Sequence, residues 1–155
     1  KSAKLVPTKP MGCFISRKGA NVRTVSNLDA VLGMMHEVFP RVEEIVFTPT
    51  VVNQTVDMIR ECRVLFGIHG AGHTNALYAR PGVGVVEAIG KDRPAYYRNI
   101  NMLLGQYYQS IVGDRTKKIT ANSDWVIDLD EARAALVKAN DHAAAWIKEH
   151  GHWRR

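Results

Sequence analysis

The residues best suited to chemistry lie in the segment 69–75 (HGAGHTN), directly after the apolar run 64–68. Its two glycines lack a Cβ, so the backbone can take unusual φ/ψ and come close to a ligand. If a helix begins here, its first amides and the positive end of its dipole form an anion site. His69, Thr74 and Asn75 can add hydrogen-bond donors. The alternative is a plain tight turn with His69 bonded locally, and the flanking polar residues favour the ligand site.

Two familiar phosphate-binding motifs do not fit this segment. A dinucleotide fingerprint would have a third glycine where this chain has Asn75, and a Walker A loop would continue into Gly-Lys-Ser/Thr. The segment is therefore a glycine turn of another type.

Charged side chains follow two other apolar runs. Arg17 and Arg23 flank the segment after the run 11–16, and the fixed fork of an arginine suits phosphate oxygens. Glu87 ends the run 83–87, where a carboxylate can accept both hydroxyls of a ribose. The alternatives are solvated surface arginines and an ion pair between Glu87 and a nearby arginine. In an open α/β sheet these positions share the carboxyl edge, where ligands bind.

Apolar runs and amphipathic stretches alternate along the chain, which is typical of an open parallel sheet with helices on both faces, a Rossmann-like α/β fold. We expect Ser26 or Asn27 to cap the first helix, and Asp128 with Glu131 to form a capping box on the last. The predicted strands are 11–16, 44–48, 64–68, 83–87 and 106–112, and the predicted helices are 26–39, 51–62, 72–78, 96–104 and 128–150.

The composition indicates one globular domain, residues 1–155, with an anionic partner. No apolar run approaches the roughly 20 residues that cross a bilayer. The net charge of +6 favours phosphates or nucleotides, and the scattered basic residues favour a small anion over a nucleic-acid duplex. Cys13 and Cys62 are too few for a disulfide scaffold; we expect two buried free thiols, with a single bridge as the alternative.

Two motifs could suggest a metal, and we assign neither of them to one. His69 and His73 are four residues apart, but His69 should precede the helix and no HExxH motif is present. The sequence Asp128-Leu129-Asp130 spells the DxD of metal–diphosphate sites, and its place at a helix start indicates capping instead. We therefore expect no metal and no cofactor.

The glycine turn and its neighbours resemble a known family. The stretch HGAGHTNALYARPGVGVVEAIG, 69–90, is similar to the HGAGLTN-type segment of glycosyltransferase family 61. The stretch ISRKGANVRTVSN, 15–27, is similar to that family's arginine-containing strand end with its second arginine and Asn. The order of these blocks follows the family from about Met11 to Val112. His73 departs from the pattern, because the family usually has an apolar residue there.

The resemblance implies a metal-independent, inverting glycosyltransferase with a GT-B fold, in which two Rossmann-like domains face each other across a cleft. This chain is similar to the C-terminal, donor-binding half, and the acceptor half is expected to precede Lys1. The implied donor is a UDP-sugar carrying xylose, arabinose or N-acetylglucosamine. The implied acceptor is a glycan or glycoprotein, with no nucleic acid and no membrane contact from this segment.

Together, the resemblance and the strand ends define a set of expected donor-binding residues. The arginines, the first histidine and the amides of the glycine turn would hold the diphosphate and stabilise the charge on the leaving UDP. Glu87 would hold the ribose, and Phe47 with Thr48 would border the base. We find no convincing general base here and expect it on the acceptor half. The expected site residues are Arg17, Arg23, Thr48, His69, Gly70, Ala71, Gly72, His73, Thr74, Asn75 and Glu87.

Two other classes of function compete with the transferase. One is a stand-alone or inactive nucleotide-binding module without transferase activity. The other, nucleic-acid binding, rests on the net charge alone. For a eukaryotic full-length protein, the resemblance implies the lumen of the Golgi or the endoplasmic reticulum.

Overall fold

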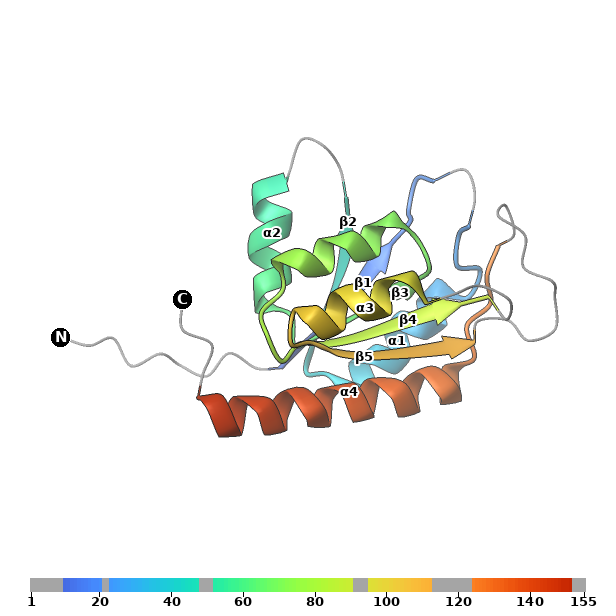
Figure 1. Ribbon diagram of the computed structural model, residues 1–155. Coiled ribbons are helices and arrows are strands. Elements are labelled where there is room, and N and C mark those ends of the chain that lie inside the picture. The colour runs from blue at the N-terminus through green and yellow to red at the C-terminus, as the bar shows by residue number, and fades with distance from the viewer. Residues whose placement is uncertain (1–9, 21–22, 48–51, 91–94, 113–123, 152–155) are drawn as a thin grey trace.

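The computed structural model describes residues 10–20, 23–47, 52–90, 95–112 and 124–151, which contain a five-stranded, all-parallel sheet (Figure 1). The predicted Rossmann-like α/β fold is thus confirmed. The strands are β1 (Met11–Ser16), β2 (Arg41–Val46), β3 (Val64–Ile68), β4 (Gly84–Ile89) and β5 (Tyr107–Val112). The helices are α1 (Leu28–Val38), α2 (Val52–Glu61), the 3₁₀ helix η2 (Ala71–Tyr78), α3 (Tyr96–Leu103) and α4 (Leu129–His150).

The order of the strands places a topological switch point in the middle of the sheet. Across the sheet the strands run β2-β1-β3-β4-β5. From β1 the chain steps outward to β2, returns to β3 on the other side, and then continues outward through β4 and β5. The loops after β1 and β3 therefore diverge at the carboxyl edge, which is where open α/β sheets form their ligand crevice.

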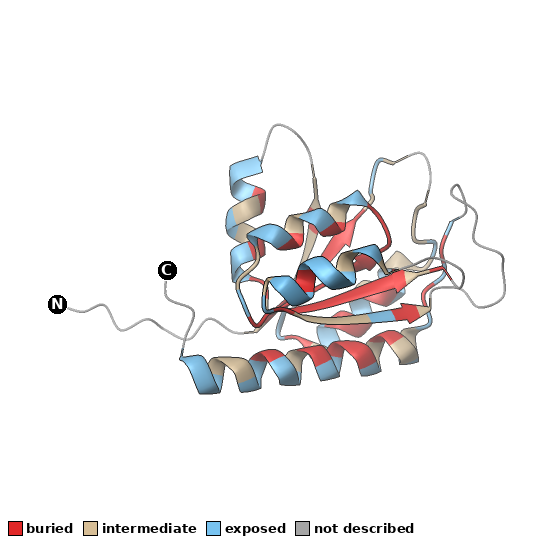
Figure 2. Cartoon of the chain, in the orientation of Figure 1, coloured by how far each residue is buried: buried red, intermediate tan, exposed pale blue. Residues whose placement is uncertain are grey.

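Helices cover both faces of the sheet, so the central strands are buried on both sides (Figures 1 and 2). On one face α1 and α4 pack over alternate strand residues such as Phe14, Phe66 and Val86. On the other face α2, η2 and α3 cover the intervening positions, among them Ile15 and Leu65. This double cover explains why β1 and β3 are apolar at nearly every position.

Cys13 and Cys62 form a disulfide between β1 and the end of α2. The expectation of two free thiols was therefore wrong, and the alternative, a single bridge, is what the structure contains. Both residues are fully buried. Cys13 lies in β1 and Cys62 directly follows α2, with their Cα atoms 5.8 Å apart. The disulfide therefore ties α2 to the centre of the sheet.

The Asp128 half of the capping box predicted for α4 is present, while the predicted cap of α1 is not. The Glu131 carboxylate accepts the backbone N–H of Val112 in β5. The Asp128 carboxylate accepts the amides of Asp130 and Glu131, each at 3.0 Å, which supports the capping interpretation of the DxD sequence. Asn27 stands at the start of α1, but its side chain makes no capping bond. Instead its amide group bonds to both the carbonyl and the N–H of Ile127, joining α1 to the segment that leads into α4.

Three strands have bounds other than those expected. β2 is Arg41–Val46 rather than 44–48, β4 is Gly84–Ile89 rather than 83–87, and β5 is Tyr107–Val112 rather than 106–112. In the described part of the chain, no helix has both the length and the apolar composition that a membrane span requires.

Candidate functional site

A pocket of about 610 Å³ opens at the switch point, within the size range of small-ligand sites. Its walls come from the ends of three strands and from η2. After β1 the segment 15–20 lines it, after β2 Val46 and Phe47, and after β3 Ile68 with the glycine turn. The described lining residues are Ile15, Ser16, Arg17, Lys18, Gly19, Ala20, Val46, Phe47, Ile68, Gly70, Ala71, Gly72 and Asn75.

Space rather than φ/ψ explains the two glycines of the turn, and the demand is stronger at Gly72. Gly70 has an extended backbone, with φ 166° and ψ 170°, and neither Gly70 nor Gly72 has a positive φ of the left-handed region. The two glycines therefore do not use the unusual backbone angles that are open to them. A Cβ on Gly72 would stand 2.7 Å from Cγ2 of Ile15, and a Cβ on Gly70 would stand 3.0 Å from Nη1 of Arg17. The glycines thus let η2 pack against β1 and let a guanidinium approach the turn.

Arg17 and Arg23 both reach this turn. Nη1 of Arg23 lies 4.0 Å from the same Cβ position on Gly70. Partial burial, and to a lesser extent the charge of Arg23, lowers the pKa of Arg17. Among the described residues, neither arginine forms an ion pair and each has a buried Nε without a hydrogen-bond partner. Two adjacent positive charges without a carboxylate form a site suited to an anion.

The backbone of Arg23 is strained, with φ 59° in the left-handed region. A non-glycine residue in that region costs on the order of 1 kcal/mol, and such strain is concentrated at functional sites. The preceding loop is also anchored: the Ser16 hydroxyl donates to Glu44 and accepts the amide of Lys18. The Ser16 bonds hold the start of the segment that carries Arg17.

His69, Glu87 and Tyr108 form a hydrogen-bonded network beside the pocket. Nδ1 of His69 lies 2.6 Å from Oε1 of Glu87, and the Tyr108 hydroxyl donates to Oε2 at 2.5 Å. Glu87 is fully buried. Burial, together with the bond to Glu87, raises the pKa of Tyr108, which keeps the hydroxyl protonated as a donor.

The expected roles of Glu87 change accordingly. Its partner is not an arginine, as the ion-pair alternative proposed, because both oxygens bond to His69 and Tyr108. A carboxylate with no exposed surface does not meet a ribose in this arrangement. The geometry assigns Glu87 to holding the imidazole of His69.

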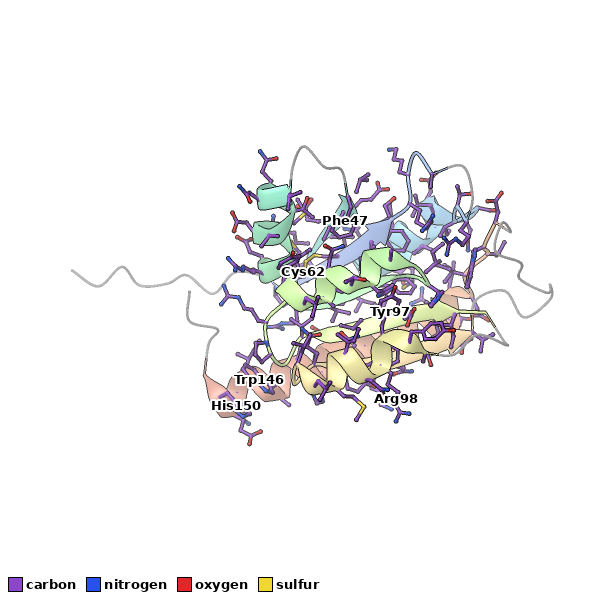
Figure 3. The ribbon with its side chains drawn as sticks, turned by 45° about the horizontal axis from the view of Figure 1, so that its top comes forward. Phe47, Cys62, Tyr97, Arg98, Trp146 and His150 are labelled. Atoms are coloured by element: carbon purple, nitrogen blue, oxygen red, sulfur yellow. A yellow bond between two sulfur atoms is a disulfide. The ribbon has the colours of Figure 1, made fainter. Side chains whose placement is uncertain are left out.

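His73 points into the protein rather than into the pocket. It is 1% exposed, and its ring lies against the backbone of Gly67 and Ile68. Burial lowers the pKa of His73, so the ring stays neutral. Its ring centroid lies 5.6 Å from that of Tyr97, and η2 lies between Phe47 on one side and Tyr97 on the other (Figure 3). His73 is thus a packing residue, where the prediction placed it in the site.

The remaining expected residues divide into three groups. Ala71 and Asn75 line the pocket, although one amide hydrogen of Asn75 is bonded to the carbonyl of Gly72 at 3.0 Å. Thr74 is exposed and does not line it. Thr48 lies outside the described residues.

The sequence interpretation missed Tyr108, together with Tyr96 and Tyr97, whose rings lie 5.9 and 5.8 Å from that of His69. The pairing register of β4 and β5 would have indicated Tyr108 as a neighbour of Glu87. Tyr108 pairs with Val85, two residues before Glu87, so Tyr108 and Glu87 project from the same face of neighbouring strands. Without a known strand order, that relation is not visible in the sequence.

The arrangement as a whole is that of a Rossmann-like α/β domain with a polar crevice at its switch point. Residues 1–86 match the model of the Glycosyltransferase 61 family, which is more than half of the chain. The chain therefore belongs to this family of glycosyltransferases. The match includes the loops after β1 and β3 and ends one residue before Glu87. A search of curated proteins found no match.

Proposed function

We propose that the switch-point pocket binds the diphosphate of a UDP-sugar and that the protein transfers the sugar with inversion and without a metal ion. The observation that carries this proposal is the pair Arg17 and Arg23, which converge on Gly70 with no ion-pair partner among the described residues. Two like charges held side by side repel each other, and an anion between them relieves that repulsion.

The groups around the arginines complete a diphosphate cradle. The first amides of a helix lack partners inside it, and the start of η2 at Ala71 lines the pocket. Guanidinium groups and amides of this kind stabilise the charge that develops on the leaving UDP, a role that a metal fills in other enzymes. Phe47 would border the uracil base from the β2 side of the pocket.

The sugar, the acceptor and the cellular compartment belong to the same proposal. We infer xylose, arabinose or N-acetylglucosamine as the sugar and a glycan or glycoprotein as the acceptor, with the chain as the donor-binding half of a GT-B enzyme. The disulfide between Cys13 and Cys62 supports an oxidising compartment such as the lumen of the Golgi or endoplasmic reticulum.

Calorimetric titration with UDP in the presence of EDTA tests the proposal. Arg17→Ala and Arg23→Ala should each weaken binding by on the order of 1–3 kcal/mol, the usual loss for a charge-assisted hydrogen bond. Arg41→Ala is the matched control. Arg41 lies at the amino end of β2, whereas the pocket lies at the carboxyl ends of the strands, and its guanidinium pairs with Glu43 and Glu61. Heat only after a divalent cation is added would refute metal independence, and no heat at all would refute the donor site.

Two further outcomes of this experiment separate the competing functions. UDP binding by a full-length protein that transfers no sugar would indicate a binding module. Binding of oligonucleotides with a steep dependence on salt concentration would indicate a nucleic-acid protein instead.

A further inference from the structure

The hydrogen bonds of His69, Glu87 and Tyr108 involve Nδ1 of the His69 ring and leave its other nitrogen, Nε2, without an assigned role. Nδ1 of His69 faces the Glu87 carboxylate at 2.6 Å, and the second carboxylate oxygen accepts the Tyr108 hydroxyl. An ionised carboxylate can only accept hydrogen bonds, so the ring nitrogen that faces it, Nδ1, carries the hydrogen. Glu87 therefore fixes the tautomer of the His69 ring. In the neutral imidazole, Nε2 then carries the free lone pair.

His69 stands next to the pocket in the chain, although it is not one of the residues that line it. It follows β3 at the carboxyl edge, and the next residue, Gly70, lines the pocket beside Arg17. Its side chain is 9% exposed, while Glu87 behind it is 0% exposed. A buried carboxylate that orients an imidazole at the edge of a site is the arrangement by which a histidine acts as a general base.

We propose that Nε2 of His69 is the general base that takes the proton from the acceptor hydroxyl, and that Glu87 and Tyr108 are positioning residues that hold the imidazole. This inference rests on the proposed transferase function. It replaces the expected role of His69 as a ligand of the diphosphate, because a ring that donates Nδ1–H to Glu87 and accepts at Nε2 has no hydrogen for a phosphate oxygen.

The proposed step balances as a displacement. The acceptor O–H bond breaks and its proton moves to Nε2, while the oxygen forms a bond to the anomeric carbon of the donor sugar. The bond from that carbon to UDP breaks, and its electron pair leaves with the diphosphate between Arg17 and Arg23. The imidazolium formed at His69 is stabilised by the negative charge of Glu87 until the proton returns to solvent.

Several other groups lie around the imidazole of His69 and its carboxylate partner. The groups on the packed elements are Glu87 of β4, Tyr108 of β5, Tyr96 and Tyr97 of α3, and His73 of η2. Glu87 is the carboxylate that bonds directly to His69, while burial keeps His73 neutral.

The tautomer can be tested without turnover by ¹⁵N NMR of the histidine side chains of the full-length protein. We expect His69 to carry its hydrogen on Nδ1 near pH 8 and to lose that preference in Glu87→Gln, whose amide can also donate. A hydrogen on Nε2 in the wild type would overturn the proposal, whether or not UDP binds.

The role in transfer is tested by the release of UDP from UDP-xylose, UDP-arabinose and UDP-N-acetylglucosamine. The glutamine of His69→Gln can still donate a hydrogen bond to Glu87 but cannot act as a base. The rate of UDP release should therefore fall about 100-fold or more, while the affinity for UDP stays within about twofold of the wild-type value. His36→Gln, on the exposed side of α1, is the matched control.

Each remaining outcome decides between the two proposals. An affinity for UDP that falls as much as the rate in His69→Gln would make His69 a diphosphate ligand and overturn this inference. A full-length protein that binds UDP but consumes none of the three donors would contradict the inference and leave the donor site intact. A protein that does not bind UDP would contradict the proposed function itself.

Discussion

Breaking the bond between Cys13 and Cys62 should have the largest effect on stability of any change considered for this chain. The two residues are 49 positions apart, so the bond closes a long loop in the unfolded chain. The chain-entropy relation for a loop of that length gives about 4 kcal/mol at 25 °C, in the upper part of the usual range. For a domain of this size a loss of that magnitude lowers Tm by roughly 10 °C.

Urea unfolding of the wild type with and without a reductant measures this effect most cleanly, because the two samples share one sequence. The double variant Cys13→Ala/Cys62→Ala should resemble the reduced wild type, with a small additional loss because both side chains are fully buried. Titration of thiols in denaturant should find none in the oxidised protein. Two titratable thiols, or equal stability with and without reductant, would refute the pairing and the oxidising compartment inferred from it.

Three smaller changes test other parts of the structure by urea unfolding. His73→Leu replaces a buried imidazole with an apolar side chain and should stabilise the protein by about 1 kcal/mol. Because burial lowers the pKa of His73, the wild type should lose stability as pH falls from about 6.5 toward the lower folded-state value, and His73→Leu should lose less; an identical pH dependence would contradict the assignment. Asp128→Ala should cost about 1 kcal/mol, the value of the cap on α4, and an unchanged midpoint would count against that cap. Gly72→Ala places a Cβ 2.7 Å from Ile15 and should cost about 1–3 kcal/mol and weaken UDP binding; wild-type behaviour would show that this close approach is not needed.

The fold was predictable because the alternation of apolar runs and amphipathic helices extends along most of the chain. β1 and β3 were predicted to the residue, since strands covered on both faces read as continuous apolar runs. The start of β2 was missed by three residues because β2 is an edge strand, and Arg41 is exposed on it. An edge strand needs no apolar face at its ends, so its boundaries are weak in sequence.

The candidate site was predictable only where its residues are neighbours in the chain or follow the ends of strands. The glycine turn and Arg17 line one pocket, as the rule for the carboxyl edge of α/β sheets predicts. The bond from Glu87 to Tyr108 and the pairing of the two cysteines depend on strand order and distance, which one sequence does not contain. The role of Gly72 was misjudged because the sequence shows a missing Cβ but not the Ile15 side chain that requires it.

The central claim is that the switch-point pocket holds the diphosphate of the donor, and ¹H–¹⁵N NMR during a titration with UDP tests it most directly. The account predicts that the largest shifts fall on the amides of the segments 17–20 and 70–75, and that uridine without phosphate shifts them far less. The amides of α4, on the far side of the sheet from η2, should stay unchanged. Shifts confined to another surface, or equal shifts with uridine and UDP, would contradict the claim.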